Sequence, residues 1–444
     1  MTKFSNHLKE LLHSLITEMA ENRQEYTVNP KSDFTRNGKR KFIEYTEYLC
    51  SKAGGTTSKE ILEFYNYQST DSVTPSAICQ ARQKINYQAF EHLFHAFNNA
   101  APSSNKLFKG YLLYAVDGSI MPIYRNPKEP SGTFENSKLN TRGSNSLHLN
   151  ATYDILNRVF VHATFQPQTK RNEKAAFAQM VDSIQTHKRI IYIADRGYES
   201  YNNFAHVIEN HQFFLIRVKD IHSNGLASRL GLPKKDCFDV LTSRIITRKR
   251  RKHFRASPDK YKIIGSTSPL DYLDDDHPTY TMSFRFVRVR LNNGEYELLC
   301  TNLPKKKFKP SDLKELYYLR WGIETSFREL KYTVGAMNLN SKKVDLIKQE
   351  LFISLLTYNF TSMIVNKTPV PKGKKKDKKH SYHINFSVAV TVCRRLIRSL
   401  AFVTPPDDVE AIISQNLEAN RYNRIFARYP SNRRRWVSFN YRVA

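Results

Sequence analysis

The stretch LLYAVDGSIMPIY, residues 112–124, is the part of the sequence that decides the fold. Its apolar run predicts a buried β-strand that leads into an acidic residue, Asp117. A second apolar run, RIIYIAD at 189–195, predicts another buried strand and ends in the same way, at Asp195. Two short carboxylates at the ends of apolar strands are the first sign of a site.

The segments around these two runs predict the other elements of an α/β core. They comprise two strands, a helix, a further helix and a last strand, at 147–156, 158–167, 172–184, 201–210 and 212–219. The resulting order is three consecutive strands, then helix, strand, helix and strand. This is the order of a ribonuclease-H-like core, whose first part we assign to residues 106–219.

The flanking regions differ in pattern. Residues 1–105 predict several short amphipathic helices with basic residues, either a helix-turn-helix-like DNA-binding domain or a domain that only packs. Alternating strand patterns and basic runs at 220–310 predict a β-rich insertion. We assign 311–370 to the second part of the core and 371–444 to a basic C-terminal helical region.

The charge of the chain points to a polyanionic partner. The 444 residues include 70 Lys and Arg against 41 Asp and Glu, which gives a formal net charge of +29. A ribosomal or membrane-surface protein also fits this surplus, but no apolar run approaches the roughly 20 residues of a spanning helix. The five cysteines are scattered without paired spacing, which fits a reducing cytoplasm and argues against structural zinc.

One predicted helix, SDLKELYYLRWGIETSFRELKYTV at 311–334, carries a polar stripe beside an apolar one. Ser311 suits its N-cap and Gly335 its C-terminal end. At about 100° per residue, four polar side chains fall in one narrow stripe: Tyr317, Arg320, Glu324 and Lys331. An ordinary solvated face with paired charges is the alternative, although Glu324 stands between cations rather than in an alternating ladder.

This spacing resembles the YREK signature of the bacterial DDE transposases of the insertion-sequence-four family. AVDGS at 115–119 and IADRGY at 193–198 are similar to the segments that carry the first and second aspartates of that family, and SAICQARQKI at 76–85 is also similar. The resemblance covers residues 75–335. It implies cut-and-paste transposition of double-stranded DNA, with a hairpin intermediate and a homodimer that holds two ends, in the cytoplasm at the nucleoid.

Phosphodiester cleavage explains the choice of residues. Two Mg²⁺ ions activate the attacking oxygen and stabilise the leaving one, and Mg²⁺ prefers hard oxygen ligands. We therefore expect Asp117, Asp195 and Glu324 to be the catalytic and metal-binding residues, with Mn²⁺ able to replace Mg²⁺. Taken singly, each aspartate also fits an ordinary residue of a turn or strand end. Two other acids near the core, Asp154 and Glu173, are interpreted as a turn residue and a helix N-terminal charge.

Five side chains are expected to contact DNA phosphates: Tyr317, Arg320, Lys331, Arg217 and Lys219. For Arg217 and Lys219, which alternate on one strand, the solubility of an edge strand is an equal alternative. The basic runs at 248–252, 372–379 and 433–435 are non-specific phosphate contacts or simply solvated. Trp321 and Trp436 fit stacking on a flipped base, but burial in the core is the favoured interpretation.

Two rival functions remain open from the sequence. One is a metal nuclease on the same fold that does not transfer strands. The other is a non-catalytic DNA-binding protein derived from a transposase.

Overall fold

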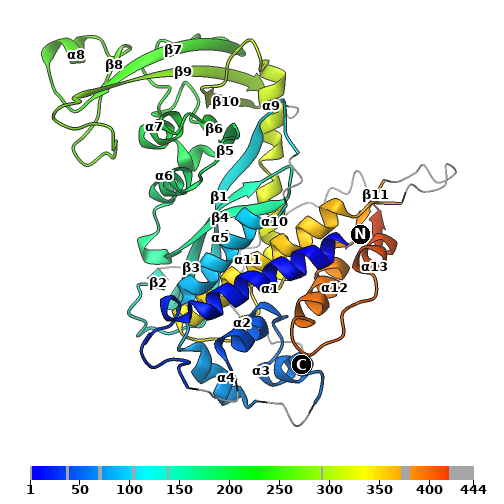
Figure 1. The fold of residues 1–444 in the computed structure, drawn as a ribbon. Helices are drawn as coiled ribbons and strands as arrows, with labels where there is room; N and C mark the ends of the chain where they lie inside the picture. The colour runs from blue at the N-terminus through cyan, green and yellow to red at the C-terminus, as the bar shows by residue number, and fades with distance from the viewer. Residues whose placement is uncertain are drawn as a thin grey trace.

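A computed structural model describes residues 3–36, 40–68, 73–102, 106–137, 140–291, 294–371 and 381–419. Its centre is a mixed sheet flanked by helices (Figure 1). Five strands form the predicted core: β1 (Leu112–Ile123), β3 (Asn140–Asp154), β4 (Val159–Pro167), β5 (Ile190–Ala194) and β6 (Phe213–Val218). They lie in the order β4-β3-β1-β5-β6, because β3 pairs antiparallel with both β1 and β4. Strand β5 runs parallel to β1, and β6 runs parallel to β5. The ribonuclease-H-like core is thus confirmed.

Alternation along the strands explains why both faces of this core are covered. Leu112, Tyr114 and Val116 pack in one apolar cluster with helices α6 (Glu173–Ser183) and α7 (Tyr201–Glu209). Leu113 points to the opposite face, into a cluster with helix α9 (Pro310–Leu319). Strand β5 is buried along its whole length, as expected of a parallel strand between two layers of helices.

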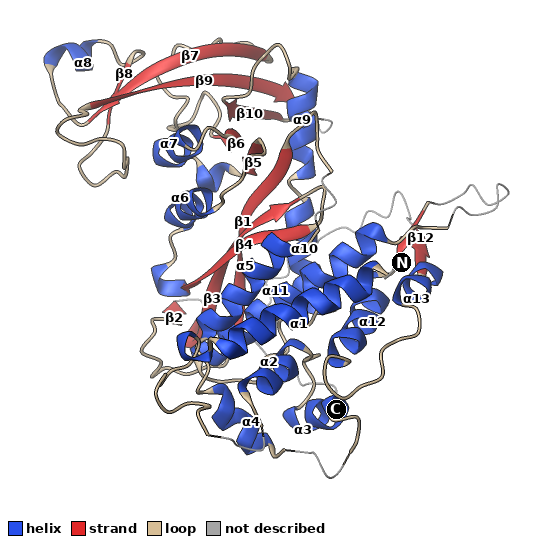
Figure 2. Ribbon diagram, in the orientation of Figure 1, coloured by secondary structure: helices blue, strands red, loops and turns tan. Residues whose placement is uncertain are grey.

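The predicted β-rich insertion forms strands, and these strands continue the core sheet. Strand β10 (Tyr296–Thr301) pairs antiparallel with β6, and β9 (Thr279–Arg290) pairs with β10. Beyond them lie β7 (Phe238–Thr247), β8 (Tyr261–Ile263) and the short helix α8 (Lys252–Ala256) (Figure 2). At the other end, β2 (Phe134–Ser137) pairs with the start of β3.

The N-terminal helices share one hydrophobic core with helices from the end of the chain. They are α1 (Phe4–Glu21), α2 (Phe42–Cys50), α3 (Thr57–Phe64), α4 (Pro75–Arg82) and α5 (Tyr87–Ala100). Their apolar faces pack on α11 (Val344–Lys367), α12 (Phe386–Arg398) and α13 (Val409–Gln415), while β11 (Tyr382–Ile384) pairs with β12 (Leu417–Ala419). Phe160 of β4 and Tyr153 of β3 belong to the same cluster. This helical layer therefore covers one face of the sheet (Figure 1).

The segment expected to form one helix over 311–334 is in fact broken into three. Helix α9 is followed by α10 (Gly322–Arg328) and then by a π-helical turn, η4 (Glu329–Thr333). The start was also misplaced: Lys309 is the N-cap, and its backbone N–H donates to Asp312 Oδ2 at 2.8 Å. The end agrees with the prediction, since Gly335 adopts a φ of +78°.

Several predicted features lie outside the described residues. They are the basic runs at 372–379 and 433–435, and Trp436. Among the residues that are described, no helix is long and apolar enough to cross a membrane.

Candidate active site

The two aspartates are brought together by the pairing of β1 with β5. In this parallel pair Val116 lies beside Ala194, and the next residue on each chain is the aspartate. Asp117 Oδ1 accepts a hydrogen bond from the backbone N–H of Gly118 at 2.8 Å. Asp195 Oδ1 accepts one from Gly197 N–H, also at 2.8 Å, and so caps a short 3₁₀ turn. Asp195 follows the end of β5 as predicted, but the prediction that Asp117 ends its strand was wrong, because β1 continues to Ile123 through its pairing with β3.

Glu324 joins them from the first turn of α10. Ile323 and Phe327 of this helix are buried in the apolar cluster that includes Ala115 of β1, which holds the helix on the sheet. The guanidinium of Arg320 links two of the acids: Nη1 lies 3.5 Å from Asp117 Oδ2, and Nη2 donates to Glu324 Oε1 at 3.0 Å. The three acids, far apart along the chain, thus belong to one cluster.

The electrostatics of Asp117 reflect this crowding. Burial raises the pKa of its carboxyl to about 6. The Gly118 N–H and the Arg320 guanidinium act in the lowering direction, while Asp195 and Glu324 add to the rise. Negative charge is unfavourable here, so a cation bound among these carboxylates would relieve the repulsion.

The cluster fits a divalent cation in ligand chemistry and in charge, because its donors are hard carboxylate oxygens. In the part of the chain that is described, however, no three His, Cys, Asp or Glu side chains stand close enough to hold a metal ion. Arg320 supplies the positive charge between Asp117 and Glu324. Direct coordination by these acids therefore requires the guanidinium to leave.

The residues expected to bind phosphate fall into two groups. Tyr317 on α9 and Arg320 are buried, and Lys331 on η4 donates to the carbonyl of Ile120 at 2.8 Å. Burial raises the pKa of Tyr317 and lowers that of Lys331. Arg217, on β6, forms an ion pair with Glu297 at 3.2 Å.

A basic cavity next to Asp195 contains the second group. Its volume is about 540 Å³, and it is lined by Arg217, Lys219, Arg196, Gly197 and Tyr296 among others. Two of these residues directly follow Asp195. Asp220 and Glu297 also line the cavity, and its three positive side chains and the phenol offer contacts for a nucleic-acid backbone.

The expected burial of Trp321 was wrong. Its side chain is 52% exposed, and the neighbouring Tyr318 is 73% exposed. Trp321 stacks on the guanidinium of Arg320, with 4.9 Å between the guanidinium carbon and the ring centre. Burial was expected because large aromatic side chains are usually part of a core, but Trp321 lies on the side of this segment that faces away from the apolar stripe of Leu316 and Ile323.

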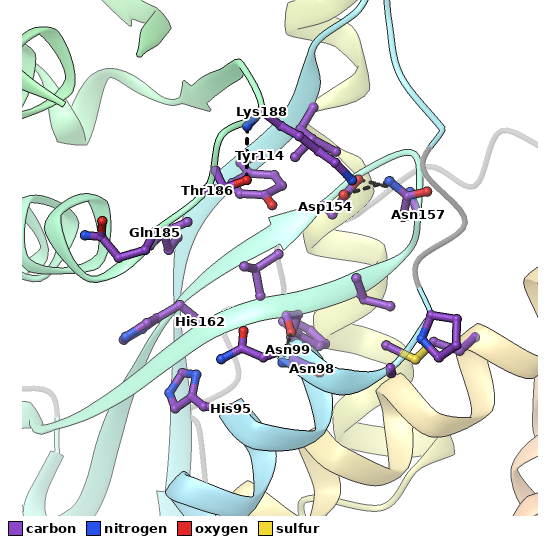
Figure 3. Close-up of a pocket in the computed structure, with 18 of the residues that line it drawn as sticks. His95, Asn98, Asn99, Tyr114, Asp154, Asn157, His162, Gln185, Thr186 and Lys188 are labelled. Carbon is purple, nitrogen blue, oxygen red and sulfur yellow. Dashed lines mark hydrogen bonds between the residues drawn. The ribbon is translucent and has the colours of Figure 1, made fainter. Parts of the chain in front are cut away.

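Asp154 lies apart from the three acids. It accepts hydrogen bonds from the backbone and the side chain of Asn157, at 3.0 and 2.8 Å, and so stabilises the β3–β4 turn as predicted. Both residues line a cavity of about 600 Å³ where α5 and α11 meet the sheet (Figure 3). Burial raises the pKa of Asp154 to about 6.

A ribonuclease-H-like core with three acids at the meeting point of β1, β5 and a helix defines the class of the protein. Residues 108–360 match the family model described as the transposase DDE domain. The chain belongs to this family, as the YREK resemblance implied.

The chain is also similar to two known transposases. The transposase InsG for insertion sequence element IS4, from Escherichia coli (strain K12), is 24% identical over 299 residues, which are 65% of this chain and 60% of that protein. The chain thus matches less than two thirds of the length of this relative. A cryo-EM structure of the piggyBac transposase synaptic complex with hairpin DNA covers 93% of this chain and 84% of its own, with 9% identity and a TM-score of 0.44.

Proposed function

We propose that the chain is a Mg²⁺-dependent transposase that cuts double-stranded DNA at the ends of its own element and joins the freed 3′-hydroxyl to target DNA. The convergence of Asp117, Asp195 and Glu324 carries this proposal. We further propose that a homodimer holds two ends and acts in the cytoplasm at the nucleoid. Mn²⁺ is expected to replace Mg²⁺.

The two aspartates and the glutamate have different tasks in the proposed reaction. When bound, two divalent cations supply activation of the attacking oxygen and stabilisation of the leaving oxygen. Asp117 and Asp195 provide fixed ligands, because each carboxylate is already held by a backbone N–H. Glu324 has a longer side chain on a helix and completes the set once Arg320 releases it.

We propose that the Arg320 guanidinium changes partners when DNA binds, from the two carboxylates to a DNA phosphate. Its guanidinium neutralises Asp117 and Glu324 in the absence of substrate and binds a phosphate when DNA arrives. Arg320→Gln is therefore expected to bind Mn²⁺ about tenfold more tightly without DNA, because a competing positive charge is gone. The same variant is expected to lose about tenfold in DNA affinity. Mn²⁺ titration followed by electron paramagnetic resonance measures the first effect.

Arg328→Gln, an exposed position on α10, is the matched control and is expected to leave Mn²⁺ affinity unchanged. Equal Mn²⁺ affinity in Arg320→Gln and wild type would contradict the proposal that the Arg320 guanidinium competes with metal for Asp117 and Glu324.

The basic cavity is proposed to bind the DNA backbone beside the cleaved bond. Arg217→Ala is expected to weaken DNA binding about tenfold and to reduce the slope of log affinity against log salt by about one, because one phosphate contact is lost. Fluorescence anisotropy at several salt concentrations measures both. Adding Lys219→Ala is expected to lower the slope further.

Lys260→Ala is the control, since this exposed lysine lies at the far end of the sheet near β8. An unchanged salt slope in the Arg217 and Lys219 double variant would favour the alternative that these charges serve solubility.

Incubation with the ends of its own element, a target plasmid and Mg²⁺ separates this proposal from its two rivals. A transposase yields both cleaved ends and joined products. A nuclease without strand transfer yields cleavage alone, and a non-catalytic DNA-binding protein yields neither.

A further inference from the structure

A fourth carboxylate, Glu173, approaches the acids from the opposite face of the sheet. Glu173 is the first residue of α6, which packs against Val116, whereas Asp117 points to the face that carries α10. A Cβ placed on Gly118 would lie 3.0 Å from Glu173 Oε1 and 2.4 Å from His148 Nε2. These two side chains therefore fill the space over the residue next to Asp117, and only glycine leaves that space free.

Glu173 is also close to the second aspartate. A Cβ placed on Gly197 would lie 3.0 Å from Asp195 Oδ1 and 3.8 Å from Glu173 Oε2. The two carboxylates therefore flank the same small gap. Glu173 therefore lies beside Asp195 and beside the residue that follows Asp117.

His148 holds Glu173 in this position. Its Nε2 lies 3.0 Å from Glu173 Oε1, and its side chain is 4% exposed. The proximity of His148 lowers the pKa of Glu173.

Several buried polar atoms around this pair lack a hydrogen-bond partner within the described residues. They are Nδ1 of His148, both side-chain amide atoms of Asn150, and the hydroxyl of Tyr198. Asn150 is fully buried and pairs across the strands with Gly118. Buried polar atoms normally have partners, so unpartnered groups beside Glu173 point to a hydrated ligand.

We propose that Glu173 is a fourth metal-binding carboxylate, held by His148, with Asn150 and Tyr198 binding the water of the cation. This inference rests on the proposed function. Three carboxylates leave two divalent cations one charge short of neutrality, and Glu173 supplies that charge. Mg²⁺ keeps several waters in proteins, and polar groups behind the ligands fix their orientation.

The test is Mn²⁺ binding by the full-length protein without DNA, followed by electron paramagnetic resonance. Glu173→Gln is expected to weaken the binding of one Mn²⁺ at least about tenfold, because one ligand charge is lost. His148→Gln is expected to weaken it less, since Glu173 keeps its charge but loses its support. Glu315→Gln, an exposed position on α9, is the matched control and is expected to bind like wild type.

Asp117→Asn distinguishes a failure of the role proposed for Glu173 from a failure of the proposed function. If Asp117→Asn loses Mn²⁺ while Glu173→Gln binds like wild type, the role of Glu173 is overturned and the proposed function stands. If neither wild type nor Arg320→Gln binds Mn²⁺, or if Asp117→Asn binds it like wild type, both fall.

Thermal unfolding in EDTA checks the fold of each variant. Glu173→Gln is expected to unfold at the wild-type temperature in EDTA and to gain less stability from Mn²⁺. Should Glu173→Gln be unstable in EDTA, Glu173→Asp replaces it, because the shorter side chain keeps the charge but withdraws it from the gap. Wild-type Mn²⁺ affinity in that variant would overturn the proposal.

Discussion

Glu324→Ala is expected to lower metal-dependent cleavage of the element ends by about a thousandfold or more, because one of the carboxylates that we propose as ligands of the cations is lost. DNA binding is expected to stay the same or to rise slightly, since the guanidinium of Arg320 loses its partner at 3.0 Å and becomes free for a phosphate. A cleavage assay with labelled ends and Mg²⁺, run beside a binding assay, measures the two effects separately.

Thr325→Ala is the matched control for this variant. Thr325 is the next residue on α10 and is exposed, and its hydroxyl donates to the carbonyl of Trp321 at 3.5 Å. It is expected to cleave at close to the wild-type rate. Cleavage that persists in Glu324→Ala would show that this glutamate is not part of the catalytic set.

The core could be predicted because its signals are local. Uninterrupted apolar runs such as Ile190–Ala194 identify buried strands, and a strand between two layers of helices needs apolar residues on both faces. Asp117 and Asp195 were found for the same reason, since each is the first acid after such a run. Their proximity then followed from the strand order.

The break in the segment 311–334 could not be predicted because its cause is tertiary. Nothing in the sequence stops a regular helix before Gly335, yet the chain forms a π-helical turn at Glu329–Thr333. In this turn Lys331 reaches the carbonyl of Ile120 on β1, while Glu329 binds Arg158 and Tyr358. A regular helix would rotate these side chains away from partners that lie far along the chain.

The role proposed for Glu173 was missed for a related reason. Its position at the start of α6 explains an acidic residue by the helix dipole alone, and this local explanation is correct. What the sequence lacks is the register that sets Gly118 opposite Asn150 and Ile120 opposite His148. The pairing of β6 with β10, which joins the insertion to the core sheet, was also missed, because the sequence does not show which strands are neighbours.

A buried ion cluster ties the N-terminal helices to the segment that follows the Glu324 helix. Glu350 on α11 pairs with Lys52 at 3.2 Å and with Arg82 at 2.8 Å, and all three side chains are less than one-tenth exposed. Glu350 also accepts hydrogen bonds from Asn340 N–H at 2.8 Å and from the Ser341 hydroxyl at 2.9 Å. Burial alone would raise the pKa of Glu350, but Lys52 and Arg82 outweigh it and hold the pKa at about 2.

Glu350→Ala is expected to destabilise the protein by about 3–5 kcal/mol, because two buried cations lose their shared counter-ion. Loss of the bonds to Asn340 and Ser341 adds to this cost. The midpoint of guanidinium unfolding, followed by tryptophan fluorescence and by circular dichroism, measures the change.

The pH dependence and a compensated variant test the origin of this effect. The pKa of Glu350 falls on folding from 4.5 to about 2, so its contribution is complete above pH 4.5 and is lost as the pH falls toward 2. Glu350→Ala is therefore expected to lose part of the acid sensitivity of the wild type. A variant that replaces Glu350, Lys52 and Arg82 together by apolar residues is expected to recover much of the stability, because no buried charge is then left unpaired. If Glu350→Ala instead unfolds within about 1 kcal/mol of wild type, water reaches Lys52 and Arg82, and the cluster is not what joins the helical layer to the site.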